Sequence, residues 1–475
     1  MKKKVKKLKP KNASGFRDLE GNLLLMKERM IEDIKYCFKL YGFDPLETPA
    51  LELSANLGKF LPDEDRPQSG VFGFKDENEW LSLRYDLTAP LSRYFSQNFR
   101  ELPSIFKRYQ IGQVWRNERG GPGRFREFTQ IDCDIIGSRS ALADSELIIL
   151  LAQILTRLFD LSKFIIKVSN RKLIQGLLED LKISSETQKL KVIRSIDKYD
   201  RLGPLGVSSL LKKGRRDPSG DFTSGANLSD EQVAKIIGYK DTKGFLQYKN
   251  IVELEELSNN FTFKEGINEL KEIFEITNKS KFLDKIIFSA EIVRGIEYYS
   301  GNIFEASITD QIKNKKGEPI ISGAIAAGGR WDGLINRFIN NNYPASGLSI
   351  GIDRIVAYIN DTANLVFGEK FDSGSAIKGP IIIATLDKNL KNTYLEVLNK
   401  LRESNIRSEI YLGNKDLQNQ MIYANRRNSP AVILIGNDEN KSNKITIKDM
   451  KKEKQFKIDK NNLINEIRKI VPKDI

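Results

Sequence analysis

A change of hydrophobic pattern near residues 361–378 divides this chain of 475 residues into two regions. The segment contains glycine and serine, a composition typical of a linker. After it, short apolar runs such as PIIIAT and AVILIG alternate with helical patterns. Such alternation predicts a mainly parallel sheet covered by helices on both faces. The sequence therefore predicts a separate C-terminal α/β domain over residues 379–475.

The longer region before this linker predicts strands and helices in a less regular order. An amphipathic helix is expected over residues 20–41, followed by a hairpin formed by VFGFKD and EWLSLRYD. IFKRYQIGQVWRNE and FREFTQIDCDIIG predict two strands joined by the loop RGGPGR, and residues 145–162 predict a helix. The segment 171–284 is lysine-rich and helical in pattern, which indicates an insertion.

Strands are expected to resume at KIIFSAEIVRG and NIFEASI. AAGGRWDGLINRF predicts a glycine turn that leads into a helix. ASGLSIGIDRIVAYI predicts a strand followed by another helix. A chain of this length needs two or three cores, in agreement with the division at the linker.

The charge of the chain suggests a polyanionic partner. Its 77 Lys+Arg against 63 Asp+Glu give a formal net charge of +14, which favours contacts with phosphates. A general enrichment of lysine in the proteins of the source explains the same charge equally well. Residues 1–13 begin with MKKKVKKLKPK and are expected to form a basic tail, because no apolar segment follows that would make a secretory signal.

The sequence contains no histidine. This excludes Ser-His-Asp catalysis, Cys-His nucleophiles and histidine-ligated metals, so any catalysis must use arginine, lysine, carboxylates, tyrosine or groups of the substrate. The two cysteines, Cys37 and Cys133, cannot form a disulfide framework and predict a reducing, cytoplasmic location. The apolar segment 146–161 is too short to span a bilayer, so no membrane association is expected.

Arginines gather around a glycine-rich turn in VWRNERGGPGRFREFTQ. They are Arg116, Arg119, Arg124 and Arg126. Glycine lets the backbone approach a phosphate closely, and guanidinium groups bind phosphate oxygens through paired donors. The segment lacks the Walker A ending and the strand–helix context of a dinucleotide fingerprint. A basic hairpin tip in solvent is the alternative interpretation.

Two further arginines lie near other strand ends. Arg354 opens a helix after GLSIGID, and Arg294 lies in EIVRGIEYYSG, among acidic residues and tyrosines. Because an unpaired buried charge is costly, this second segment is either a solvated edge or the floor of a polar pocket. Arginines on separate strand ends suit a nucleoside triphosphate whose reaction builds negative charge at phosphorus.

Together these segments resemble the motifs of a known family. YGFDPLETPALE resembles motif 1 of class II aminoacyl-tRNA synthetases, VWRNERGGPGRFREFTQIDCDIIG resembles motif 2, and GLSIGIDRI resembles motif 3. LRYDLTAP, RGIEYYSG and AAGGRWDGL narrow the resemblance to histidyl-tRNA synthetases, whose signatures read RGLDYY and GGRYDGL. It covers residues 14–170, 285–358 and, more weakly, the last hundred residues.

The resemblance implies an α+β fold and a domain order. A catalytic domain with the antiparallel sheet of class II synthetases would be formed in two parts, 14–170 and 285–360. The helical insertion 171–284 would separate them. The linker 361–378 and a C-terminal α/β anticodon-binding domain, 379–475, would follow. Motif 1 implies a homodimer.

The resemblance also implies roles for individual residues. Arg116 would hold the α-phosphate of ATP and the amino acid carboxylate, and Arg294 would stabilise the pentavalent phosphorus. Arg124 and Arg126 would bind ATP, with Arg354 at the γ-phosphate end. The residues implied in binding L-histidine are Asp86, Thr88, Gln130, Asp134, Arg294, Tyr298 and Tyr299. Mg²⁺ bridging phosphate oxygens is implied as well, without identifiable ligands.

The implied activity is the ATP-dependent attachment of L-histidine to tRNA(His) through a histidyl-adenylate, with release of AMP and diphosphate. The alternative is a non-catalytic paralogue that regulates ATP phosphoribosyltransferase in histidine biosynthesis; such proteins typically lose catalytic arginines and the C-terminal domain. A synthetase for threonine, proline or glycine, and a generic RNA-binding protein, account for fewer of the motifs.

The sequence departs from the family pattern at several positions. Asp134 stands where glutamate is usual, Trp331 replaces the tyrosine of GGRYDGL, and Glu297 replaces the aspartate of RGLDYY. The loop RGGPGR differs from the common RPQKGR, which leaves open whether an extra 5′ guanosine of the tRNA is recognised. In the C-terminal domain, Arg426 and Arg427 are candidates to replace lysines that usually contact the anticodon.

Overall fold

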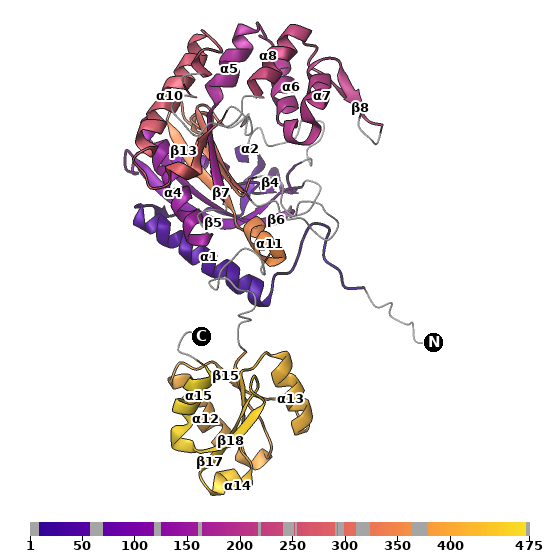
Figure 1. Cartoon of the computed structure of the whole chain (residues 1–475), viewed down its shortest axis with the longest axis vertical. Helices are drawn as coiled ribbons and strands as arrows, with labels where there is room; N and C mark the ends of the chain where they lie inside the picture. Colours follow the sequence, from indigo (N-terminus) through magenta and orange to yellow (C-terminus); the bar gives the residue numbers. More distant parts are fainter. Residues whose placement is uncertain are drawn as a thin grey trace. The chain divides into compact units, whose positions relative to one another are not determined.

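The computed structural model separates into two compact units. It describes residues 9–57, 70–117, 125–159, 164–216, 220–240, 251, 254–289, 292, 299–309, 324–362 and 379–471. The first unit comprises Met1–Leu19 and Leu23–Thr362, and the second comprises Glu20–Asn22 and Ala363–Ile475 (Figure 1). Among the described residues, no helix combines the length and the apolar character needed to cross a membrane.

The described part of the first unit is built on a sheet of eight strands in the order β1-β5-β6-β13-β12-β11-β7-β10. Their bounds are β1 Asp44–Pro45, β5 Phe106–Trp115, β6 Glu127–Ile136, β7 Phe164–Asn170, β10 Ile286–Phe288, β11 Asn302–Ile308, β12 Ala326–Arg330 and β13 Ala345–Gly351. The five interior pairings are antiparallel, and only the two outermost pairs, β1/β5 and β10/β7, are parallel. The antiparallel sheet predicted from the sequence is confirmed.

Two amphipathic helices cover this sheet. Helix α1 (Gly21–Leu40) buries Met30, Ile34 and Cys37, as its periodicity predicts. Helix α4 (Ala141–Leu158) is almost entirely apolar on its buried faces and packs against β13. It begins four residues before the position expected from the sequence, because the Ser140 hydroxyl accepts a hydrogen bond of 3.2 Å from the N–H of Leu142 and caps the helix.

A smaller three-stranded sheet, β2-β4-β3, stands beside the main sheet. Its strands are β2 Leu51–Leu53, β3 Gly73–Asp76 and β4 Glu79–Leu83, and it is followed by helix α3 (Thr88–Asn98), with α2 (Ser54–Leu57) after β2. The predicted hairpin is confirmed: β3 and β4 pair antiparallel around a tight turn in which Glu77 has a φ of 49°.

The glycines of AAGGR lie within strand β12 and do not form the turn predicted from the sequence. A Cβ at Gly328 would lie 2.3 Å from the carbonyl oxygen of Gly347 on β13 and equally close to the ring of Phe304 on β11. These glycines therefore allow close approach of neighbouring strands. The helix expected after them is a single 3₁₀ turn, Ile335–Arg337. That prediction was wrong because glycine was taken as a turn signal.

The segment between β7 and β10 is mostly helical. Its described helices are α5 Arg171–Asp180, α6 Glu186–Ile196, α7 Tyr199–Leu211, α8 Asp230–Lys240 and α10 Phe261–Thr277, gathered at one end of the first unit (Figure 1). Helix α10 packs against α5 and against α4. Within the segment GRRDPSGDFTSG, where the sequence predicted a loop, β8 (Gly214–Arg216) pairs antiparallel with β9 (Phe222–Ser224).

The second unit contains a mixed sheet in the order β15-β14-β16-β17-β18. Its strands are β14 Ile381–Ile383, β15 Ser408–Ile410, β16 Ala431–Leu434, β17 Lys444–Asp449 and β18 Lys454–Asp459. Strand β14 pairs parallel with β15 and β16, whereas β16, β17 and β18 pair antiparallel. The prediction of a mainly parallel sheet was therefore wrong for its second half, and β18 was missed because its residues are almost all exposed.

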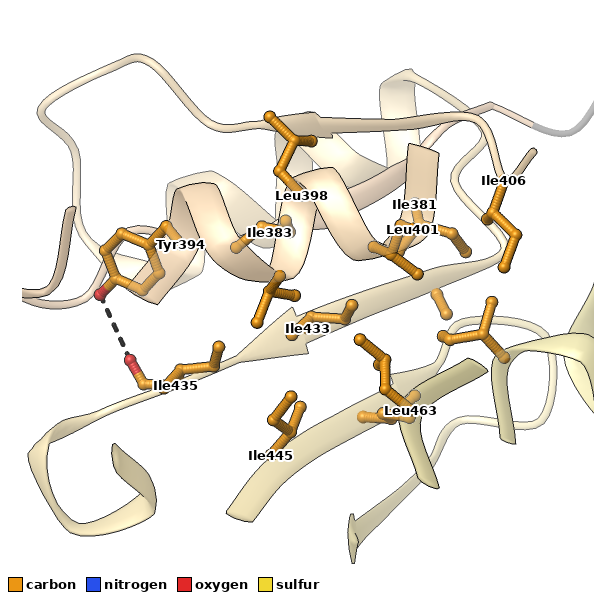
Figure 2. Packing of buried hydrophobic residues seen from close by; sticks show 14 of the residues in the cluster. Ile381, Ile383, Tyr394, Leu398, Leu401, Ile406, Ile433, Ile435, Ile445 and Leu463 are labelled. Atoms are coloured by element: carbon orange, nitrogen blue, oxygen red, sulfur yellow. Dashed lines mark hydrogen bonds between the residues drawn. The ribbon is translucent and has the colours of Figure 1, made fainter. Parts of the chain in front are cut away.

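Helices cover both faces of this sheet. Ile381, Ile383 and Ile433 pack on one face against α12 (Lys391–Glu403) and α15 (Leu463–Ile470), and the alternate residues face α13 (Leu417–Arg426). Figure 2 shows the first face, where the hydroxyl of Tyr394 also donates a 3.2 Å hydrogen bond to the carbonyl of Ile435.

The packing of the second unit predicts the effect of truncating its core. Ile433→Ala should cost about 2–5 kcal/mol of local stability, because it leaves a cavity between β16 and α12. Hydrogen exchange of the full chain should then be faster in peptides covering β14 and β16. Leu412→Ala, at a side chain that is 92% exposed in the same unit, should leave that exchange unchanged. Equal protection in the two variants would contradict this view of the core.

Candidate active site

A row of buried polar side chains lies along one face of β6. Gln130, Asp132 and Asp134 alternate along the strand and therefore point to the same face. The Gln130 side-chain amide donates to both carboxylate oxygens of Asp132, at 3.0 and 2.9 Å. The register of the sheet places Arg108 of β5 opposite Asp134 and Ser349 of β13 opposite Asp132.

Asp134 is held differently at its two oxygens. The indole N–H of Trp331 donates to Oδ1 at 3.1 Å. Nη2 of Arg108 lies 2.7 Å from Oδ2 and forms an ion pair with it. On the other side, a Cβ at Gly347 would lie 2.1 Å from Oδ1 and 2.8 Å from the indole nitrogen. Only glycine at position 347 leaves room for this contact.

Burial strongly perturbs the acidic groups of the site. It raises the pKa of Asp132 to about 7, with the charge of Asp134 adding to the effect and Arg108 opposing it. Burial raises the pKa of Asp134 to about 6, against the lowering by Arg108 and the Trp331 hydrogen bond. The two carboxyls titrate as a pair. Burial, and then the two carboxylates, also raise the pKa of Tyr299, so its hydroxyl stays protonated at neutral pH.

Arg116 lies at the end of this polar row, just beyond β5. Its Nη2 donates to Oε1 of Gln130 and its Nε to the carbonyl of Tyr85, both at a long 3.4 Å. The guanidinium lies 4.4 Å from the ring centroid of Tyr85 and 5.1 Å from that of Phe128. The stacking fixes the plane of the guanidinium. Its weak hydrogen bonds leave donors that a stronger acceptor can take over.

Asp86 lies two residues before the first residue of α3 and binds the first backbone N–H groups of that helix. Its Oδ1 accepts hydrogen bonds from the backbone N–H groups of Thr88, at 3.1 Å, and Ala89, at 2.9 Å. Asp86 is buried, and its charge contributes to the raised pKa of Asp134. The structure therefore brings Asp86 close to the β6 row, and it places Thr88 at the first position of α3.

Arg126 faces Arg116 across the β5–β6 ladder. The backbone N–H of Arg116 donates to the carbonyl of Arg126 at 2.8 Å, and the N–H of Arg126 donates to Gly15 at 2.9 Å. The Arg126 guanidinium contacts the side-chain oxygen of Asn117 and lies 4.6 Å from the ring centroid of Phe72. Two of the predicted arginines are therefore adjacent.

Arg354 lies in the first turn of α11 (Ile352–Thr362), and its guanidinium donates to the carbonyl of Ala324. The start of this helix is fixed by the neighbouring Asp353, which is buried. Lys27 of α1 donates to both oxygens of Asp353, at 3.1 and 3.0 Å, and the backbone N–H of Thr129 donates to it at 2.6 Å. This contact holds α11 against β6, next to Gln130.

Three of the residues predicted for the site lie outside the described residues. They are Arg124, Arg294 and Tyr298. The structure brings together Arg116, Gln130 and Asp134. Asp86 and Tyr299 lie near them, because the charge of Asp86 raises the pKa of Asp134 and the charge of Asp134 raises the pKa of Tyr299.

The sequence analysis missed Arg108, Asp132 and the contact made by Trp331. Asp132 could have been found, because a polar residue at every second position of a strand marks one polar face. Arg108 could not, because its role depends on the register between β5 and β6. The Trp331 contact depends on strands that are distant in sequence.

The described residues do not fit a metal site held by the protein. They contain no group of three or more cysteine, aspartate or glutamate side chains arranged to bind a metal ion. The carboxylates of β6 are instead occupied by an arginine, an amide and an indole. None of the described residues is therefore assigned as a ligand of the Mg²⁺ expected from the sequence.

Comparisons with known proteins agree with this geometry. A family model described as histidyl-tRNA synthetase matches residues 15–355, and one described as anticodon binding domain matches residues 380–470. A histidine–tRNA ligase of Pelagibacter ubique is 42% identical over 98% of this chain and all of the relative. One from Dinoroseobacter shibae is 40% identical over 94% of this chain and 91% of the relative.

A solved structure gives the same result for the fold. The crystal structure of histidyl-tRNA synthetase from Nostoc sp. PCC 7120 superposes with a TM-score of 0.75 at 25% identity, over 98% of this chain and all of that chain. The antiparallel sheet with its polar β5–β6 hairpin, followed by an anticodon-binding domain, defines a class II aminoacyl-tRNA synthetase. Within that class, the chain belongs to the histidyl-tRNA synthetase family.

The raised pKa values predict how stability depends on pH. Between about pH 4 and pH 7 the folded state binds more protons at Asp132 and Asp134 than the unfolded state does, so their contribution to stability falls as the pH rises. Asp132→Asn removes one of the titrating groups. The drop in Tm between about pH 5 and about pH 8 should therefore be smaller in this variant than in the parent.

Asp284→Asn provides the control, because the Asp284 side chain is 70% exposed. This variant should show the same drop in Tm as the parent. Thermal unfolding followed by circular dichroism at the two pH values makes the comparison. An equal or larger drop in Asp132→Asn would show that this carboxyl does not titrate as described.

Proposed function

We propose that this chain attaches L-histidine to tRNA(His) in an ATP-dependent reaction. The observation that carries the proposal is the row formed by half-buried Arg116 and buried Gln130, Asp132 and Asp134, which has a cation at one end and carboxylates at the other. Such a row complements an amino acid with a carboxylate, an ammonium group and a ring N–H. The full-length similarity to histidine–tRNA ligases supports the same activity.

The selection of histidine would depend on Asp134 and Tyr299. The imidazole ring has one N–H donor and one nitrogen acceptor. A carboxylate at Asp134 would accept from the ring N–H, and the protonated hydroxyl of Tyr299 would donate to the other nitrogen. An amino acid without these groups would leave buried polar atoms unpaired, which is a strong basis for rejection. Asp86 and Gln130 would bind the ammonium group, with Thr88 and Tyr298 completing the site.

In the first step, a histidine carboxylate oxygen attacks the α-phosphorus of ATP and diphosphate leaves. Arg116 and Arg294 would stabilise the negative charge that develops on the phosphate oxygens. Arg124, Arg126 and Arg354 would bind the remaining phosphates. The weak hydrogen bonds of Arg116 make it a suitable donor, because little is lost when it turns to a phosphate. Magnesium is expected to arrive bound to ATP.

In the second step, the terminal ribose hydroxyl of tRNA attacks the acyl carbon of histidyl-adenylate and AMP leaves. The sequence has no histidine to serve as a base. A phosphate oxygen of the adenylate would therefore accept the hydroxyl proton. The chain's own residues position the reactants and balance charge, and the substrate supplies the proton acceptor.

The second unit is expected to bind the anticodon. Of the two arginines expected to replace lysines there, Arg427 is bound to Glu409 through Nε at 3.2 Å and Nη2 at 2.9 Å. The hydroxyl of Tyr423 donates to the same carboxylate at 2.7 Å. The side chain of Arg426 is exposed, so Arg426 is the better candidate for contact with tRNA phosphates.

A homodimer in the cytoplasm completes the proposal. The small β2-β4-β3 sheet exposes large apolar side chains on one face near the motif 1 segment: Leu51, Leu53 and Phe74. Such patches usually mark a protein interface, and a second copy of the chain would cover this one. The two cysteines are unpaired and buried, in keeping with a reducing compartment.

The alternative, a non-catalytic regulator of ATP phosphoribosyltransferase, is less well supported. Arg116 and Arg354 occupy ordered positions beside β6, and the second unit is a complete folded sheet. A protein without aminoacylation activity would have no need to keep these groups together. Amino-acid-dependent exchange of pyrophosphate into ATP separates the two functions, since a regulator would not catalyse it.

The proposal predicts exchange of pyrophosphate with histidine alone among the twenty amino acids. Arg116→Ala should reduce that exchange by about 10²–10³-fold, the range expected when one donor to a developing negative charge is lost. Arg294→Ala should abolish most of it. Both variants should keep the Tm of the parent, because neither arginine is predicted to hold the fold together.

Arg100→Ala is the matched control, because Arg100 is exposed and its guanidinium carbon lies 5.6 Å from the ring centroid of Phe99, away from the β6 residues. This variant should exchange at the rate of the parent. Exchange with another amino acid, or none with any, would refute the proposed activity. Normal turnover by Arg116→Ala would refute the role given to that residue.

A further inference from the structure

Trp331 is held rigidly at the end of β12. Its backbone N–H donates to the carbonyl of Ala345 on β13 at 2.7 Å. Its indole is almost completely buried in a cluster with Leu91, Phe95, Phe106, Ile136, Ile335 and Ala345. A side chain enclosed in this way cannot change rotamer without disturbing the cluster. The indole N–H therefore has a fixed direction.

That N–H meets Oδ1 of Asp134 at 3.1 Å. The contact requires Gly347, because even a methyl group there would overlap both Oδ1 and the indole nitrogen. Asp134 and Trp331 are also two positions at which this sequence departs from the usual pattern of its family. The structure shows that the two differing residues are bonded to each other.

The second carboxylate oxygen of Asp134, Oδ2, has different contacts from Oδ1. Oδ2 is buried, and no described group donates a hydrogen bond to it. Nη2 of Arg108 lies 2.7 Å away and balances its charge, but this nitrogen is directed to the carbonyl of Leu87, at 3.2 Å. Oδ2 therefore has an ion-pair partner but no well-directed hydrogen bond. A carboxylate oxygen in this state has a lone pair left for a ligand donor.

We propose that Trp331 is a positioning residue for amino acid recognition: it occupies Oδ1 of Asp134 and so presents Oδ2 to the ring N–H of the substrate. The inference rests on the proposed function. Aspartate is one methylene shorter than glutamate and depends on a fixed donor to keep its carboxylate in one orientation. The indole provides this donor from within the apolar cluster, so Trp331 would act through Asp134 and not by contact with the substrate.

The same hydrogen bond affects the charge of Asp134. The charged and titratable groups that face it are Arg108 from β5, Asp132 on β6, Asp86 before α3 and Tyr299 before β11. Burial raises the pKa of Asp134, and Arg108 and the indole N–H oppose that rise. Loss of the indole N–H should therefore protonate Asp134 at a higher pH and weaken it as an acceptor.

Trp331→Phe tests the proposal, because it removes the N–H and keeps an aromatic ring in the cluster. In pyrophosphate exchange, KM for histidine should rise at least about tenfold, as expected for a lost hydrogen bond to a charged group. KM for ATP and kcat should change less than about threefold. The pH below which KM for histidine rises should also move upward, which a purely structural role would not produce.

A matched control lies on the β5–β6 hairpin, which also carries Asp134. The indole N–H of Trp115 donates to Glu127 at 2.8 Å, so Trp115→Phe removes the same kind of bond at a different carboxylate. This variant should keep the KM and the pH profile of the parent. Asp134→Asn should raise KM for histidine strongly, and adding Trp331→Phe to it should raise KM no further, because Trp331 acts through the Asp134 carboxylate.

The outcomes separate this inference from the activity on which it rests. Suppose that the parent enzyme shows histidine-dependent exchange and that Trp331→Phe keeps the KM and the pH profile of the parent. That result would leave the proposed function standing and overturn the role of Trp331. Equal losses in KM for ATP, KM for histidine and kcat would also overturn it, since they indicate a general disturbance. A parent enzyme without histidine-dependent exchange would overturn the proposed function, and this inference with it.

Discussion

The ion pair between Arg108 and Asp134 is the interaction on which the site depends. Asp132 and Asp134 are both buried on one face of β6, and Arg108 faces them from β5. Without that cation, two carboxylates would share a site of low dielectric with no compensating charge. The pair exists only because the β5–β6 register places residue 108 opposite residue 134. The register of the sheet therefore determines which charged side chains meet in the site.

Glycine at defined positions lets the strands come close enough for this arrangement. Gly347 gives Asp134 and Trp331 room to meet, and Gly328 lets β12 lie between β11 and β13. The polar side chains are thus positioned by strands, which hold a geometry more tightly than loops do. The contact of Lys27 with Asp353 extends the same rigidity to the start of α11, next to β6.

The sequence predicted those parts of the fold that depend on local patterns. Helix α1, the β3–β4 and β5–β6 hairpins and the β13–α11 unit follow from periodicity and turn residues. The sequence-based prediction failed where the structure depends on contacts between distant strands. These contacts place the glycines within β12, make half of the second sheet antiparallel, and bring Arg108 and Trp331 to Asp134. Gln130 and Asp134 were found through motif resemblance, whereas Asp132, between them, needed the sheet. The roles of all these site residues remain predictions, and Arg124, Arg294 and Tyr298 also lie outside the described residues.

The charges of this chain act at two different ranges. The net charge of +14 favours approach of a polyanion such as tRNA over distances comparable to the Debye length, roughly 8–10 Å. The buried charges of β6 itself are of the opposite sign, Asp132 and Asp134, and Arg108 of β5 faces them. Since burial reduces the screening by solvent, these local charges act more strongly on a group beside them than the net charge of the chain does. In the proposed function, the net charge would attract RNA and the buried acidic groups would select the small substrate.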